Sequence, residues 1–326
     1  MNVLLTEMLA HADPSQVDGL SRFFKTGPGQ YGEGDKFLGI KVPVTREVVK
    51  GCWRALDFAD LEECVSSEYH EVRLSALLAL VEIFAHVDKR PRVKPGVTET
   101  IKSGVTETIK SGVMETIKSG VMETIKSGVM ETKLDDTSFR TRSGISRESC
   151  VDFYLAHTRY INNWDLVDLS CYPLLGVWLL DKDRALLYEL ARNGKTIWEQ
   201  RIGIVSTMTF IRHGQLSDTF AIADILLHHP HDLIQKAVGW LLREAGKRDK
   251  AALEAWLQEI PGQARGEGEK APSGASGDRA GMVSCDSKVG AAGFGAAPRY
   301  KSMPRTMLRY AIEKFPEDER QRYLRG

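Results

Sequence analysis

A tryptophan and an aspartate, Trp164 and Asp168, have the residue types and the spacing to bind positive charge. They lie in the run YINNWDLVDLS, in which Asn162 or Asn163 can cap the N-terminus of a helix. Residues four apart share one helix face, so the ring and the carboxylate would lie together. An aromatic face attracts a cation, and a carboxylate adds a full negative charge. The pair therefore predicts a site that stabilises a cation.

Two later segments pair a tryptophan with a basic residue. Trp198 and Arg201 are three apart in KTIWEQRIGIV, and Trp240 and Arg243 are three apart in IQKAVGWLLREAGKRD. Apolar residues continue the helical stripe of Trp198, so we expect that ring in the core. Trp240 has Lys236 and Arg243 on one helical side, which favours a ring in polar surroundings. A lone helical tryptophan is more often a core residue, so the prediction rests on this pairing.

The ordered motifs WDLVD, WEQR and KAVGWLLRE resemble those of the AlkD-type HEAT-like repeat DNA alkylation repair glycosylases. The resemblance extends to FLGIKVP at 37–43 and to MPRTMLRYAIEKF near the C-terminus. It implies an alkylpurine DNA N-glycosylase, a hydrolase, in which Asp168 is the catalytic residue. It also implies that Trp164 and Trp240 bind the lesion nucleotide and that Arg201 binds a backbone phosphate. The partner would be double-stranded DNA that carries alkylated bases.

Further residues are candidates for contacts with the DNA backbone: Lys236, Arg243, Arg305 and Thr306. The last two are predicted at a helix N-terminus, where exposed amides favour anions. The stretch FFKTGPGQYGEGDKFLGI resembles a subset of the same family, and Lys25 or backbone amides in it are candidates for DNA contact. GPGQYG within it matches GxGxxG, but no strand precedes the match, so it predicts a loop with unusual backbone angles.

The chemistry implied for Asp168 follows from the charge of the lesion. Alkylation at N3 or N7 makes the purine cationic, so the base leaves readily and needs no strong general acid. An ionised carboxylate near the anomeric carbon would stabilise the forming sugar cation and direct a water onto it. A charged Asp165 would raise the pKa of Asp168 and Arg201 would lower it. We expect Asp165 itself to be solvated or to serve the helix cap, because it lies in the first turn.

Two other classes of function stay open. A non-catalytic HEAT-like scaffold that binds DNA or protein would disperse Asp168, Trp164 and Trp240 into the core, whereas the enzyme brings them to one concave patch. Arg201 would then serve only as an ion-pair partner. An RNA-binding repeat protein is less favoured, because no regular set of base-reading side chains recurs along the chain.

Helical periodicity dominates the sequence and predicts an all-α fold. Residues 70–87 place Leu74, Leu77 and Leu78 on one stripe, with Glu71 and Arg73 off it. Similar stripes predict helices over 43–56, 146–158, 172–190, 196–211, 216–227, 231–245 and 304–315. Short breaks between them favour HEAT-like antiparallel helix pairs, stacked into a curved α-solenoid with a concave DNA-facing surface.

One domain over 1–326 is expected, interrupted by two insertions. The first, 95–145, contains octapeptide repeats of the type GVTETIKS, whose apolar residues recur every four positions. On a helix that stripe drifts by about 40° per step, so a loosely ordered insertion without a catalytic role is favoured, and a short β-solenoid stays open. The second, 262–298, is rich in Gly, Ala and Ser and predicts a flexible linker.

The composition is that of a soluble globular protein, with 42% apolar and 27% charged residues and a net charge of zero. Zero charge counts mildly against nucleic-acid binding, but from residue 299 eight Lys and Arg face four Asp and Glu. Neither a membrane span nor a secretion signal is expected. Five scattered cysteines predict a reduced, cytoplasmic protein, which we expect to be a monomer.

No cofactor or metal is expected. The one tempting cluster lacks a metal-binding motif and straddles a proline, so it predicts a turn between helices: His228, His229, His231 and Asp232.

Overall fold

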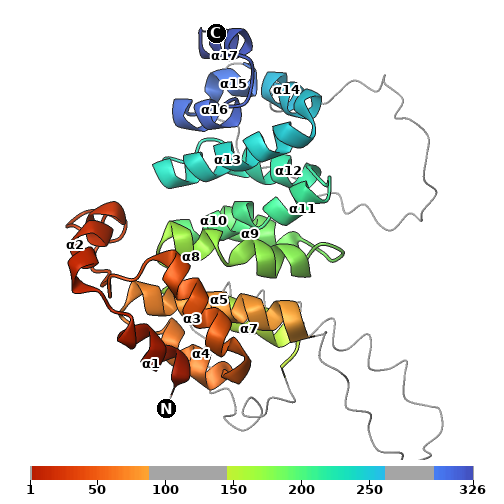
Figure 1. Ribbon diagram of the computed structural model, residues 1–326. Helices are drawn as coiled ribbons and strands as arrows, with labels where there is room; N and C mark the ends of the chain where they lie inside the picture. Colours follow the sequence, from red (N-terminus) through yellow and green to blue (C-terminus); the bar gives the residue numbers. More distant parts are fainter. Residues whose placement is uncertain (1, 88–144, 261–296, 326) are drawn as a thin grey trace, which may run out of the picture.

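A computed structural model describes residues 2–87, 145–260 and 297–325 (Figure 1). In these ranges the chain is helical, and the only β-type pairing is an isolated bridge between Lys36 and Tyr69. The all-α prediction is therefore confirmed. The expected insertions at 95–145 and 262–298 lie outside the described residues apart from their last positions, so the predictions about them stay predictions.

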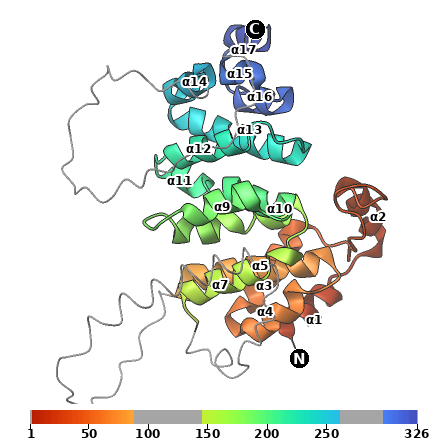
Figure 2. The same cartoon turned by 180° about the vertical axis from the view of Figure 1, so that it is seen from behind.

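The helices follow one another along a stack that runs from the N-terminus at one end to the C-terminus at the other (Figure 1). They are α1 Val3–Ala10, α2 Pro14–Phe23, α3 Val42–Cys52, α4 Phe58–Val65, α5 His70–His86, α7 Arg147–Ala156, α8 Trp164–Asp168, α9 Ala185–Asn193, α10 Ile197–Val205, α11 Met208–Arg212, α12 Ser217–Ile225, α13 Asp232–Arg248, α14 Lys250–Gln258, α15 Arg299–Ser302, α16 Arg305–Ala311 and α17 Glu317–Arg325. The view from behind shows the same order of layers (Figure 2).

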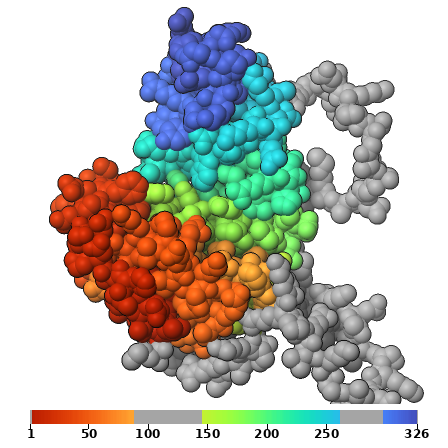
Figure 3. All heavy atoms as spheres, viewed as in Figure 1, coloured from red at the N-terminus to blue at the C-terminus, as the bar shows by residue number. Residues whose placement is uncertain are grey.

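Neighbouring helices pack in pairs, as the HEAT-like prediction requires. The strongest packing joins α9 to α10, α4 to α5 and α13 to α16, while α10 also packs against α13 in the next layer. The space-filling view shows a hollow at one edge, between the projecting segment around α2 and the helices α13 and α16 (Figure 3). The helices α8 and α10 lie between these two rims (Figure 1).

The predicted helix over 172–190 is wrong as a single element. A π-helical turn over Tyr172–Gly176 comes first, and α9 begins only at Ala185. Arg184 explains the break, because its side chain donates to the carbonyls of Leu179 and Leu180 at 3.2 and 2.6 Å. These bonds satisfy carbonyls that a continuous helix would have bonded itself.

The predicted helix over 196–211 is also divided, into α10 and α11. The break falls at Ser206 and Thr207, whose hydroxyls donate to the carbonyls of Ile202 and Ile204, each at 2.7 Å. Hydroxyls that bond the preceding turn compete with the helix hydrogen bonds and bend the chain.

Charged residues anchor the N-terminal segment on α5. Glu71 lies off the apolar stripe as predicted, yet it is buried, and its carboxylate accepts the backbone amides of Leu38, Gly39 and Ile40 at 2.9, 2.9 and 3.1 Å. Gly39 has φ +87°, and a Cβ there would lie 1.9 Å from the carbonyl oxygen of Asp13. The FLGIKVP motif therefore crosses α5 in a conformation that needs both the carboxylate and the glycine.

Candidate functional site

The short helix α8 positions the two residues from which the sequence analysis began. The Asn163 side chain accepts the backbone amide of Trp164 at 2.9 Å and caps the helix, which confirms the predicted start. Trp164 is half-buried, and the side chain of Asp168 is 14% exposed. The helix therefore presents both groups at a surface while the residues between them face the core.

Arg201 on α10 holds the carboxylate of Asp168. Its Nε donates to Oδ1 at 2.8 Å and its Nη2 donates to Oδ2 at 2.7 Å, in a two-point fork. Its Nη1 donates to the carbonyl of Leu233, near the start of α13, at 2.5 Å. The guanidinium is buried, so Arg201 joins α8, α10 and α13 and leaves little surface for a phosphate.

The electrostatic surroundings of Asp168 act in opposite directions. Burial raises the pKa of Asp168 above its ordinary value of 3.8, while the charge and hydrogen bonds of Arg201 lower it and Asp165 raises it. The two-point fork from Arg201 favours the ionised form of the carboxylate, because hydrogen bonds to a charged acceptor are stronger. Burial outweighs Arg201, so the pKa of Asp168 is raised and this carboxylate protonates more readily than an exposed one.

Aromatic rings surround Trp164. Phe24 stacks on it with ring centroids 5.6 Å apart, and Phe23 meets it edge to face at 6.0 Å. Tyr31 lies edge to face with Trp198 at 6.0 Å, and Trp198 is buried in the core as predicted. The end of α2 and the loop after it thus cover one side of α8.

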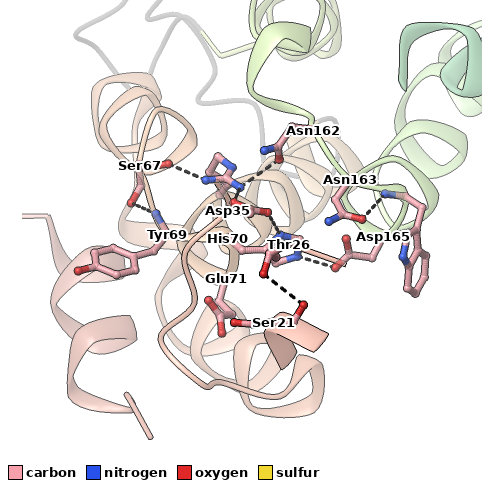
Figure 4. A network of polar contacts seen from close by, with 12 residues as sticks. Ser21, Thr26, Asp35, Ser67, Tyr69, His70, Glu71, Asn162, Asn163 and Asp165 are labelled. Carbon is pink, nitrogen blue, oxygen red and sulfur yellow. Dashed lines mark hydrogen bonds and ion pairs between the residues drawn. The ribbon is translucent and has the colours of Figure 1, made fainter. Parts of the chain in front are cut away.

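The prediction for Asp165 is wrong, because this residue is neither solvated nor a cap. It is buried, and its Oδ2 lies 2.8 Å from Nε2 of His70 (Figure 4). Nδ1 of His70 lies 2.8 Å from Asp35, which also pairs with Arg73. Ionised carboxylates only accept hydrogen bonds, so both ring nitrogens must donate and His70 is an imidazolium. Although burial lowers it, the bonds to Asp165 and Asp35 raise the pKa of His70 to about 9.

Sequence reasoning missed this buried cluster of His70, Asp35, Asp165 and Arg73. The partners are distant in the chain, and no spacing between them marks a contact. The available signal was the presence of His70 and Arg73 at the start of a helix that is mostly apolar after them. Arg73 also donates to Asn162 at 3.0 Å, so the cluster ties α5 and the loop between α2 and α3, which carries Asp35, to the entrance of α8.

Trp240 lies on α13, further along the helix than the carbonyl that Arg201 contacts. It follows Leu233 by seven residues on α13, which places it on the same side of the helix but about 10 Å along the axis. It is half-buried and lines a cleft of about 480 Å³ together with Met208, Ile211, Arg212, Glu244, Lys247 and Arg248. The structure therefore joins Arg201 to Asp168 on the helix that also carries Trp164, and Trp240 lies two turns beyond Leu233 on α13.

The predicted phosphate contacts lie on α13 and α16. Lys236 pairs with Asp232 at 2.6 Å, and Arg243 pairs with Glu313. Arg305 and Thr306 begin α16 as predicted, and the Arg305 side chain donates to the Leu324 carbonyl. These three cations have partners within the protein, so binding a phosphate requires them to exchange or share those partners.

The histidine-rich segment serves the turn before α13. The Nδ1 atom of His231 accepts the amide of Leu233 at 3.2 Å and caps α13, which confirms the turn. Across the described ranges, no group of His, Cys, Asp and Glu side chains could hold a metal ion. None of the helices in those ranges is long and apolar enough to cross a membrane.

The comparison with family models agrees with the resemblance found in the sequence. A family model described as DNA alkylation repair enzyme matches residues 4–111 and 93–315. Among solved structures, a predicted DNA alkylation repair enzyme from Enterococcus faecalis is similar at 12% identity and a TM-score of 0.40, over 74% of this chain and 87% of that chain. Curated proteins gave no match. Because the family model covers most of its length, this chain belongs to the DNA alkylation repair enzyme family.

Proposed function

We propose that this protein is a DNA glycosylase that excises cationic N3- and N7-alkylated purines from double-stranded DNA. The observation that carries the proposal is the carboxylate of Asp168, held at two points by Arg201 and only 14% exposed. It shares its short helix with the half-buried ring of Trp164. A fixed anion beside an aromatic ring suits a reaction in which positive charge moves from a base to a sugar.

In the proposed reaction, the bond between the alkylated base and the sugar breaks, and the base leaves as a neutral molecule. The sugar becomes an oxocarbenium-like cation, which the ionised Asp168 stabilises, and the same carboxylate accepts a proton from the attacking water. Arg201 fixes the orientation of the carboxylate and favours its ionised form. We assign Arg201 to this positioning role ahead of the phosphate contact implied by the family resemblance.

The remaining site residues are proposed as DNA contacts. Trp164 would lie against the sugar of the lesion nucleotide, and Trp240 would contact the backbone two turns along α13. Four residues would bind phosphates along the rim formed by α13 and α16: Lys236, Arg243, Arg305 and Thr306. The contribution of the three cations is measurable as a dependence of DNA affinity on salt concentration. A monomer in the cytoplasm stays our prediction.

The decisive experiment is incubation of the protein with duplex DNA that carries one N7-methylguanine, followed by detection of the released base. Asp168→Asn keeps the side-chain size and removes its charge, so release should fall by about 100-fold or more while DNA affinity stays near the wild-type value. Asp181→Asn, at an exposed carboxylate, is the matched control. Melting temperatures check that each variant folds.

Undiminished release by the Asp168→Asn variant would contradict the assignment. Tight binding of methylated DNA without any release by the wild-type protein would instead favour the non-catalytic scaffold.

A further inference from the structure

Two consecutive phenylalanines at the end of α2 have opposite environments. Phe24 is buried, stacks on Trp164 and on Phe37, and lies at a tilt against the imidazole of His70. Phe23 is 61% exposed, more than any other large apolar side chain in the described residues, yet its ring still meets Trp164 edge to face. One face of Phe23 is therefore open to solvent directly beside the candidate lesion-binding ring.

The residues that flank Phe23 are basic and exposed. Arg22 lies in the last turn of α2, where its Nε donates to the Asp18 carbonyl, and Lys25 follows Phe24. None of the ion pairs found among the described residues includes Arg22 or Lys25. An open aromatic ring between two cations combines base stacking with phosphate attraction, which is how proteins hold nucleic-acid strands.

The backbone at Lys25 supports a functional reading of this segment. Lys25 has φ +58°, and in the described ranges it is the only residue other than glycine with a positive φ. The amide of Thr26 donates to the carbonyl of Ser21 at 3.1 Å, which is the bond that closes a helix C-terminus with a left-handed residue. Glycine is the usual residue at such a position, because a side chain there is strained. Lys25 adopts this conformation although it carries a side chain.

We propose that Arg22, Phe23 and Lys25 form a DNA-binding edge on α2, with Phe23 stacking on a nucleotide next to the one held at Trp164. The proposal rests on the proposed function, because it takes Trp164 as the place of the lesion. The edge forms one rim of the hollow in Figure 3, and α13 and α16, which carry the other phosphate-binding candidates, form the opposite rim. A DNA strand that crosses the hollow would contact both rims.

Affinity measurements test the edge independently of catalysis. Each change is placed in the Asp168→Asn background, and the dissociation constant is measured for duplex DNA with and without N7-methylguanine. Phe23→Ala should weaken binding by about tenfold or more, and Phe23→Trp should restore it, because stacking needs an aromatic face. Leu9→Ala is the matched control, since Leu9 is 49% exposed on α1, at the foot of the stack.

A second variant keeps the proposal testable if Phe23→Ala disturbs the fold. Arg22→Gln combined with Lys25→Gln should lower the slope of log affinity against log salt by about two. An affinity for Phe23→Ala equal to that of Leu9→Ala, or an unchanged salt slope for the double variant, would overturn the proposal. So would a concentration-dependent dimer of the wild-type protein that Phe23→Ala abolishes, because the edge would then bind a second copy. If the wild-type protein releases no base but these affinity changes are found, the edge stands and the glycosylase assignment fails.

Discussion

Replacing His70 with glutamine should remove a pH-dependent part of the stability of this protein. The side chain of His70 is 1% exposed and lies between two carboxylates, each at 2.8 Å. Raising its pKa from 6.5 to about 9 corresponds to about 3 kcal/mol in favour of the protonated native state, at about 1.36 kcal/mol per pH unit. Because the buried cluster connects α5, the loop between α2 and α3, and α8, this energy stabilises the helix that carries Asp168.

The sign of the effect follows from proton binding. Between pH 6.5 and 9 the native state holds a proton on His70 that the unfolded chain has released, so stability falls as the pH rises. The contribution is complete below pH 6.5 and disappears as the pH rises through about 9. Glutamine carries no charge at any pH, so the wild-type protein should exceed His70→Gln in stability at pH 6, and this excess should shrink by about 3 kcal/mol by pH 10.

Urea unfolding of both proteins at several pH values between about 6 and 10, followed by tryptophan fluorescence, measures this difference. His11→Gln, at an exposed histidine next to α1, is the control and should leave the pH dependence of the wild-type protein in place. A stability difference between wild type and His70→Gln that stays constant over the whole range would refute the reasoning. It would show that His70 is not held as an imidazolium.

Three further predictions concern the site and its support. Arg201→Gln removes the cation that lowers the pKa of Asp168. The acidic limb of the pH profile for base release, measured in single-turnover assays, should therefore move to higher pH. An unchanged limb would show that Arg201 does not control the protonation of Asp168. Gly39→Ala should destabilise the protein by at least about 2 kcal/mol in urea unfolding, because φ is +87° and the new Cβ would meet the Asp13 carbonyl; a neutral substitution would show that the segment shifts freely. The site residues offer no evident acid to protonate a neutral leaving base. N7-methylguanine should therefore be released orders of magnitude faster than uracil in the same DNA sequence and salt. Comparable rates would mean that a general acid exists.

The parts of the fold that local patterns determine were predictable from the sequence. Apolar periodicity predicted most of the long helices, and the short polar residue before Trp164 predicted the start of α8. The breaks inside 172–190 and 196–211 were not predictable from periodicity. They depend on Arg184 and on two hydroxyls that bond carbonyls of the preceding turn, and no apolar pattern reports such bonds.

In the candidate site, too, the features set by local spacing were predictable and those set by distant contacts were not. The spacing of Trp164 and Asp168 predicted their neighbourhood on one helix, and pairing with Arg201 was one of two open alternatives. The burial of Asp165 depends on His70, 95 residues earlier in the chain, and a contact over that separation leaves no trace in local spacing. The position of Trp240 depends on where α10 meets α13, which only the packing of the stack determines.

Arg201 contacts both the Asp168 carboxylate and the Leu233 carbonyl on α13. Through these contacts the protonation of Asp168 and the position of α13 are thermodynamically coupled. Such coupling is reciprocal for binding equilibria. If bound DNA displaces α13 and changes the proton affinity of Asp168 by some factor, protonation of Asp168 must change the affinity for DNA by the same factor. Proton uptake on DNA binding can be measured by calorimetry in buffers of different ionisation enthalpy. The difference in uptake between wild type and Asp168→Asn would therefore measure the coupling between DNA binding at α13 and protonation of Asp168.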